Sequence, residues 1–129
     1  MMNHHTLVLG ASTNPSRVSF QAIGRLVAGG FAVSAVGLRE GEVAGVAIQT
    51  GTPAIKDVHT ITLYLNAKRQ EPLYDYILGL APKRIIFNPG TENAELAALA
   101  RQAGIETEAA CTLVMLATDS YSQEEEAKS

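Results

Sequence analysis

The sequence has little cysteine, no excess of basic residues and no long apolar run, and each shortage excludes a class of protein. Among 129 residues Cys111 is the one cysteine, so neither an internal disulfide nor a multi-cysteine metal site can form. It lies in an apolar stretch, where a free cysteine is usually a small buried side chain. The formal charge is −3, whereas nucleic-acid binding normally needs a basic face. No apolar stretch reaches membrane-spanning length. We therefore expect a soluble cytoplasmic protein that binds neither nucleic acid nor membrane.

What the sequence does contain is an apolar strand that runs directly into a loop of small residues and then into a helix. The strand is expected at residues 7–9, the loop at 10–17 and the helix at Val18–Ala28, whose apolar residues make one stripe. This order directs backbone N–H groups and the positive end of a helix dipole at one point in solvent. A phosphate group fits there, so the segment predicts a nucleotide-like ligand.

The rest of the sequence continues the alternation of strands and helices. Further strands are expected at 31–36, 61–65, 84–87 and 105–108, and helices at 73–80, 92–103 and 112–117. Thr91 is the expected N-cap of the helix at 92–103. The Gly-rich segment 37–51 is expected to be an irregular connection with one short extended piece at 43–48. One domain at residues 1–121 would be followed by a disordered acidic tail at 122–129.

Strands that alternate with helices indicate a parallel sheet with right-handed crossover connections. We predict a single Rossmann-like α/β domain, with a doubly wound, mainly parallel sheet of about five strands and flanking helices. Ligands of such folds bind at the carboxyl ends of the strands. The loops expected there, at residues 10–17, 37–39, 66–69 and 88–91, form the candidate site.

The first two of these loops narrow the class of ligand. A dinucleotide fingerprint reads G-x-G-x-x-G, but Gly10 is followed by Ser12 and Pro15 at the second and third glycine positions. After the second strand, NAD-binding domains place an acidic residue that holds a ribose hydroxyl, whereas this chain has Arg39. A guanidinium suits a phosphate on the ribose, which both NADP and coenzyme A carry. Hydride chemistry usually also needs a substrate domain, for which no sequence remains.

Several motifs occur in an order that is typical of a known family. They are Gly10-Ala11-Ser12 with Asn14, Pro15 and Arg17; Ser19-Phe20; Val43-x-Gly45; Pro53-Ala54-Ile55-x-Asp57-Val58; and Asn88-Pro89-Gly90 before Glu95-Leu96-Ala97. Over residues 7–115 the chain resembles the small single-domain CoA-binding proteins related to the N-terminal domain of the succinyl-CoA synthetase α subunit. The chain departs from that family in two places: Arg39 is all that remains of an Asn-Pro-Lys motif, and His59-Thr60 stands where members often have Asp.

The resemblance implies that the chain binds coenzyme A or an acyl-CoA at the carboxyl ends of its strands. The pyrophosphate would lie against residues 10–12 and the first helix, with Arg17 or Arg39 near a phosphate. The residues expected to bind the ligand are Gly10, Ala11, Ser12, Asn14, Arg17, Ser19, Arg39, Asn66, Asn88, Pro89 and Gly90.

Catalytic groups and metal ligands are not expected. His59 should lie at the start of the third strand, at the opposite end of the sheet from the ligand loops, so no base reaches Ser12 or Ser19. His4 and His5 fall in a terminus that is expected to fray, and no metal-ligand motif is present. We therefore expect a binding protein rather than an enzyme.

A second hypothesis stays open, because the loop at 37–39 departs from the family and one fold hosts many functions. In this alternative the chain is a ligand-free or NADP-type Rossmann module that acts by protein interaction or as an accessory subunit. A homodimer is compatible with either hypothesis.

Overall fold

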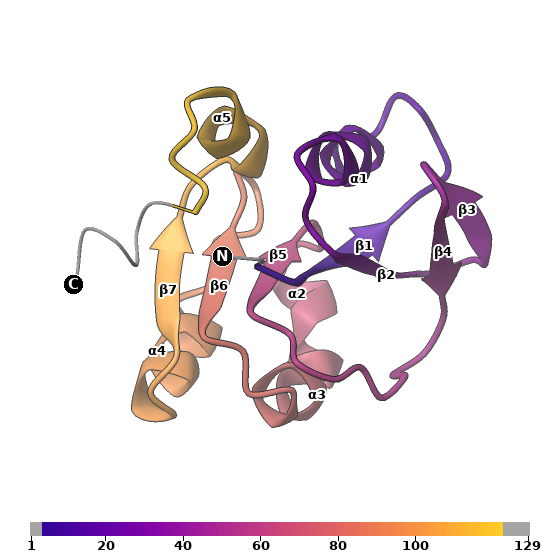
Figure 1. The fold of residues 1–129 in the computed structure, drawn as a ribbon. Coiled ribbons are helices and arrows are strands. Elements are labelled where there is room, and N and C mark those ends of the chain that lie inside the picture. The colour runs from indigo at the N-terminus through magenta and orange to yellow at the C-terminus, as the bar shows by residue number, and fades with distance from the viewer. Residues whose placement is uncertain (1–3, 123–129) are drawn as a thin grey trace.

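The computed structural model describes residues 4–122, which form one seven-stranded sheet in the order β3-β4-β2-β1-β5-β6-β7 (Figure 1). The strands are β1 (Thr6–Ala11), β2 (Val33–Gly37), β3 (Gly41–Val43), β4 (Val46–Gln49), β5 (Thr60–Leu63), β6 (Arg84–Phe87) and β7 (Glu106–Ala109). All neighbouring strands are parallel except β3 and β4, which pair antiparallel. The prediction of a Rossmann-like, mainly parallel α/β sheet is confirmed.

Helices cover both faces of the sheet (Figure 1). On one face α1 (Val18–Ala28) contacts α5 (Thr112–Ala117). The other face carries α2 (Ala67–Gln70), the 3-10 turn η1 (Glu71–Leu73), α3 (Tyr74–Gly79) and α4 (Ala94–Gln102). Because successive side chains of a strand point to opposite faces, Leu7 and Leu9 of β1 pack in the core under α3 and α4, while Val8 packs in the core under α1. No helix of the described residues is long and apolar enough to cross a membrane.

The number of strands is higher than the predicted five because residues 37–51 are not one irregular connection. They contain the β3–β4 hairpin, whose turn residues Ala44 and Gly45 have φ angles of 52° and 82°. Two-residue turns of this kind need positive φ at both positions and are usually marked by Asn-Gly or Asp-Gly. An alanine at the first position removed that signal from the sequence.

The start of α4 also differs from the prediction. Asn93, rather than Thr91, is the N-cap, and its Oδ1 accepts a hydrogen bond from the Leu96 N–H at 3.1 Å. Thr91 is buried, and its hydroxyl donates to the Asn88 carbonyl oxygen at 2.7 Å. Thr91 therefore closes the turn after β6 instead of starting the helix.

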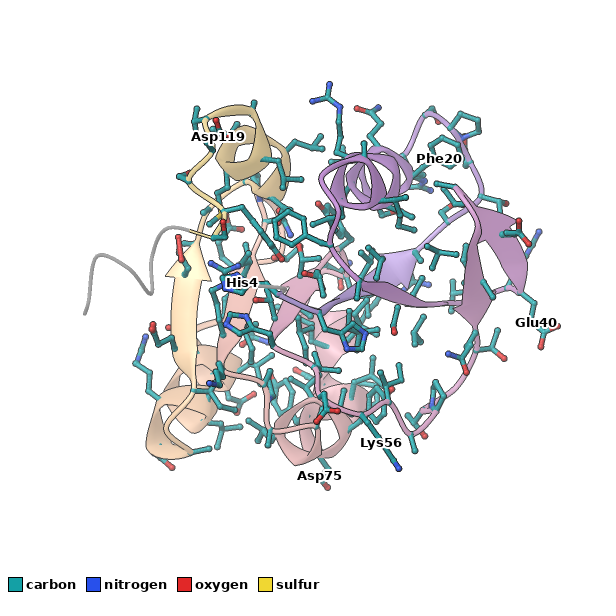
Figure 2. The ribbon with its side chains drawn as sticks, in the orientation of Figure 1. His4, Phe20, Glu40, Lys56, Asp75 and Asp119 are labelled. Carbon is teal, nitrogen blue, oxygen red and sulfur yellow. The ribbon has the colours of Figure 1, made fainter. Side chains whose placement is uncertain are left out.

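His4 and His5 are not frayed, contrary to expectation. His4 is 2% exposed and stacks on His59, with ring centroids 3.8 Å apart and an interplanar angle of 5°. His5 Nε2 lies 2.8 Å from Ser34 Oγ. Figure 2 shows His4 surrounded by side chains. The predicted acidic tail lies outside the described residues, apart from Ser122.

Arg84 joins the starts of the strands to the end of the described chain. Its guanidinium lies over the Tyr121 ring, 4.5 Å from the centroid, and Nη1 donates to the Tyr121 carbonyl oxygen at 2.9 Å. Its Nε donates to Thr60 Oγ1 at 3.0 Å, while the hydroxyls of Tyr121 and Thr6 lie 2.5 Å apart. We call the edge at the strand starts the amino edge, and the amino-edge cluster comprises His4, Thr6, His59, Thr60, Arg84 and Tyr121.

Candidate ligand site

The loops that follow β1, β2, β5 and β6 meet at one edge of the sheet, because these strands are parallel. We call this the carboxyl edge. Residues 10–17, 37–39, 66–69 and 88–91, which were predicted to form the site, all lie there. Ser19 is the one predicted residue inside a helix, and it is buried in the first turn of α1.

The end of β1 approaches the ends of β2 and β5 so closely that two positions require glycine. Gly10 has a φ of 104°, and a Cβ there would lie 3.0 Å from the Tyr64 carbonyl carbon and 3.1 Å from the Tyr64 Cβ. A Cβ on Gly37 would overlap the Ala11 carbonyl oxygen. These glycines let the ends of β1, β2 and β5 lie against one another.

Polar side chains of this loop give it its shape. Ser12 Oγ accepts a hydrogen bond from the Asn14 N–H at 3.0 Å, and Asn14 Oδ1 accepts from the Ser16 N–H at 3.0 Å and from its hydroxyl at 2.8 Å. The segment 13–18 is nevertheless exposed. Ser12 and Asn14 therefore hold an exposed loop in one conformation in front of α1.

The N-terminus of α1 suits an anion better than those of α2 and α4 do. Its N-cap, Arg17, makes no side-chain hydrogen bond to the first turn, which contains no acidic residue. By contrast Asn66 Oδ1 caps α2, and α4 has the Asn93 cap together with Glu95 in its first turn. Uncapped N–H groups and the helix dipole both favour a negative group at the start of α1.

The charges around the carboxyl edge are mixed. The cations Arg17 and Arg39 are exposed in the loops after β1 and β2, and Arg69 is exposed on α2, which follows β5. Glu40 and Glu42 line an open hollow of about 700 Å³ on the β3–β4 hairpin, and Glu40 directly follows Arg39 in the sequence. Figure 2 shows Glu40 pointing away from the body of the protein. The carboxylates of Glu40 and Glu42 therefore weaken the positive potential on the hairpin side of the edge.

Asn88 is buried, although the sequence predicted it to bind the ligand. It is 2% exposed; its Nδ2 donates to Thr62 Oγ1 at 2.6 Å and to the Leu63 carbonyl oxygen at 2.9 Å. Its Oδ1 accepts from the Thr112 N–H at 2.9 Å. The amide thus ties the loop after β6 to β5 and α5, and it leaves the exposed Pro89-Gly90 segment at the edge.

Tyr64 is a residue of this edge that the sequence analysis did not select. It directly follows β5, lies against Gly10, and burial raises the pKa of its phenol to about 12. Its buried hydroxyl lies near the Thr62 and Thr112 side chains without a hydrogen bond of good geometry among the described residues. Cys111, the N-cap of α5, is half-buried rather than fully buried and lies near this phenol. The sequence predicted a strand at 61–65, which contains Tyr64, so Tyr64 was not expected at the end of the strand.

The comparisons with known proteins identify the family. Residues 4–117 match the CoA-binding domain family. The chain belongs to this family. A solved structure described as an uncharacterized protein has the same fold, with a TM-score of 0.89 and 44% identity over 93% of this chain and 99% of that one. No curated protein matches the sequence.

More distant solved structures share the fold of this CoA-binding domain. A hypothetical protein from Pyrococcus horikoshii OT3 has 22% identity and a TM-score of 0.78, covering 87% of this chain and 80% of its own. A protein from Thermus thermophilus has 20% identity and a TM-score of 0.81, covering 91% and 90%. At these identities the likeness concerns the arrangement of the elements alone.

The residues at the carboxyl edge fit the ligand class of the family. Coenzyme A carries a pyrophosphate and a ribose phosphate, which need N–H donors and cations. The uncapped start of α1 supplies donors beside Arg17. Arg39 is an exposed cation in the loop after β2, the strand beside β1. The edge therefore holds groups of the required types for both phosphates.

Proposed function

We propose that the protein binds coenzyme A or an acyl-CoA reversibly at the carboxyl edge and catalyses no reaction on it. The observation that carries this proposal is the uncapped, exposed N-terminus of α1 in a member of the CoA-binding domain family. The pyrophosphate would accept hydrogen bonds from the first turn of α1, with Arg17 alongside. Arg39 would bind the phosphate on the ribose, the group that distinguishes coenzyme A from its dephospho form.

The positions of the histidines support binding without catalysis. His4 and His59 belong to the amino-edge cluster, and His5 bonds to Ser34 at the same end of the sheet. No imidazole therefore lies within reach of Ser12 to act as a general base. Within the described residues no group of three His, Cys, Asp or Glu side chains could hold a metal ion.

A panel of ligands tests the proposal directly. Thermal unfolding of the purified protein is measured with coenzyme A, acetyl-CoA, dephospho-CoA, NADP and NAD at equal concentrations. Because a ligand that binds the native state raises the apparent stability, coenzyme A should raise the melting temperature more than either dinucleotide. Equal shifts with all five ligands, or none with any, would contradict the proposal.

The alternative is a module that acts by protein interaction without coenzyme A. Glu40 and Glu42 favour it, since two carboxylates beside Arg39 lower the local attraction for a ribose phosphate. This alternative would be supported if no ligand of the panel shifts the melting temperature and sedimentation experiments show a dimer or a stable complex. A shift specific to coenzyme A would remove it.

A further inference from the structure

Gln70, at the end of α2, has its polar side chain completely inside the protein, with 0% exposure. Its Nε2 donates two hydrogen bonds, to the Leu65 carbonyl oxygen at 2.7 Å and to the Thr91 carbonyl oxygen at 2.8 Å. Its Oε1 accepts from Asn93 Nδ2 at 2.9 Å. Both N–H donors and the oxygen of one amide are thus engaged with separate segments of the chain.

These contacts join the two loops on one side of the candidate site. Leu65 lies in the connection after β5, which leads into Asn66 and α2, and Thr91 ends the loop 88–91 after β6. The strands are neighbours, but backbone ladder hydrogen bonds stop where β5 and β6 end. Beyond that point the Gln70 amide connects the loops in place of the ladder.

The connection extends to the start of α4. Asn93 Nδ2 also donates to the Tyr74 hydroxyl at 2.9 Å, and that hydroxyl donates to Glu95 Oε1 at 2.9 Å. The other end of the Asn93 amide caps α4 through the Leu96 N–H. Gln70 therefore lies at the centre of a network in which each link needs a donor or acceptor at a fixed place.

Core packing alone does not account for a buried amide at this position. Methionine has a similar volume and length and fills space without polar atoms that must be satisfied. What the amide adds is geometry, because a primary amide supplies two donors and an acceptor in one plane.

We propose that Gln70 is a positioning residue for the ligand site: by bridging the loops after β5 and β6 it fixes their separation, and thereby the affinity for coenzyme A. The inference rests on the proposed function of the carboxyl edge. Gln70 itself is too deeply buried to touch the ligand, so it acts through the Asn66 and Pro89-Gly90 segments.

Two substitutions test this role by calorimetric titration with coenzyme A. Gln70→Met removes all three hydrogen bonds and should weaken binding roughly tenfold or more in a folded protein. Gln70→Glu keeps the acceptor but loses both donors while it is ionised. Gln102→Met, on the exposed end of α4, is the matched control and should bind like the wild type.

The Gln70→Glu variant should show a pH dependence that a purely structural role would not produce. Burial raises the pKa of a carboxyl group, so the variant regains an O–H donor as the pH falls from 8 to 5. Its affinity relative to wild type should then recover in part. The two proteins are compared at each pH because the ligand phosphates also titrate. Tyr74 and Glu95, the titratable neighbours in the network, are the same in all variants.

The outcomes separate this inference from the proposed function. If the wild type binds coenzyme A and Gln70→Met binds equally well, the positioning role is wrong. If the affinity of Gln70→Glu relative to wild type stays constant with pH, the positioning role is also wrong. A wild type that does not bind overturns the proposed function and, with it, any role of Gln70 toward this ligand.

Amide hydrogen exchange of the ligand-free protein tests the bridge between the two loops without a binding measurement. In Gln70→Met the amides of both segments 66–69 and 88–93 should exchange faster, and those of 10–17 should not change. Faster exchange in one segment alone would show that Gln70 does not bridge the two loops.

Discussion

The two edges of the sheet are built in opposite ways. At the amino edge, side chains far apart in sequence fill the space between the strand starts, and His4, Arg84 and Tyr121 are each 2% exposed. At the carboxyl edge the chain leaves the loop 13–18 exposed and the N-terminus of α1 without a side-chain cap. If the carboxyl edge binds the ligand, as we propose, stability and binding are assigned to different ends of the same strands.

The largest expected effect comes from the amino edge. Arg84→Met removes the hydrogen bonds to Thr60 and Tyr121 and the contact with the Tyr121 ring. It should lower the free energy of unfolding by at least about 3 kcal/mol, measured by urea denaturation. The exposed Arg101→Met is the matched control. If the two edges have separate roles, the folded Arg84→Met protein keeps its affinity for coenzyme A. A loss of affinity together with the loss of stability would contradict this separation.

Gly10→Ala should lower both the stability and the affinity for coenzyme A, because Gly10 has a positive φ at the carboxyl edge. At a φ of 104° the new Cβ would lie about 3 Å from Tyr64, so we expect a loss of about 2 to 3 kcal/mol and weaker binding of coenzyme A. Gly24→Ala on α1, where a Cβ meets nothing within 4 Å, should instead stabilise the protein by up to about 1 kcal/mol. Equal stability of the two variants in urea would refute the close approach at Gly10.

The Tyr64 phenol makes the carboxyl edge sensitive to alkali. Its pKa is raised from 10 to about 12 in the folded state, so its contribution to stability is complete below pH 10 and is lost as the pH rises through 12. Between pH 10 and pH 12 the wild type should lose about 2 kcal/mol more than Tyr64→Phe. Urea denaturation at a series of pH values measures this difference. Identical pH profiles of the wild type and Tyr64→Phe would contradict the raised pKa of Tyr64.

The smallest effect concerns Arg39, which is exposed. Arg39→Ala should weaken coenzyme A about tenfold and leave dephospho-CoA nearly unchanged, since the charge-assisted bond forms with the ribose phosphate alone. Calorimetric titration of both ligands measures the ratio, with Arg101→Ala as control. Equal weakening of both ligands would move Arg39 to the shared pyrophosphate, and no change in either would leave it a surface cation.

Local patterns were enough to predict much of the fold. The helices Val18–Ala28 and Thr112–Ala117 and the strand Arg84–Phe87 have the predicted bounds, because each has clear periodicity or a β-branched apolar run. The β3–β4 hairpin was missed because Ala44 is not a residue that marks positive φ.

Contacts between distant segments could not be predicted in the same way. The stacking of His4 on His59 and the contact of Tyr121 with Arg84 leave no signal in any local window. His4 and His5 were therefore expected to lie in a frayed terminus. At the carboxyl edge, the predicted parallel sheet was enough to predict which loops lie together. Which side chains are used internally, as Asn88 and Gln70 are, depends on hydrogen bonds across 20 residues or more of sequence.

The most direct test of where the ligand binds is an NMR titration of the ¹⁵N-labelled protein with coenzyme A. The amide signals of the carboxyl-edge residues Ser12, Arg17, Arg39 and Gly90 should shift and saturate together, while those of His4, Arg84 and Tyr121 at the amino edge should stay in place. Saturable shifts confined to the amino edge, or none at the carboxyl edge, would contradict the account.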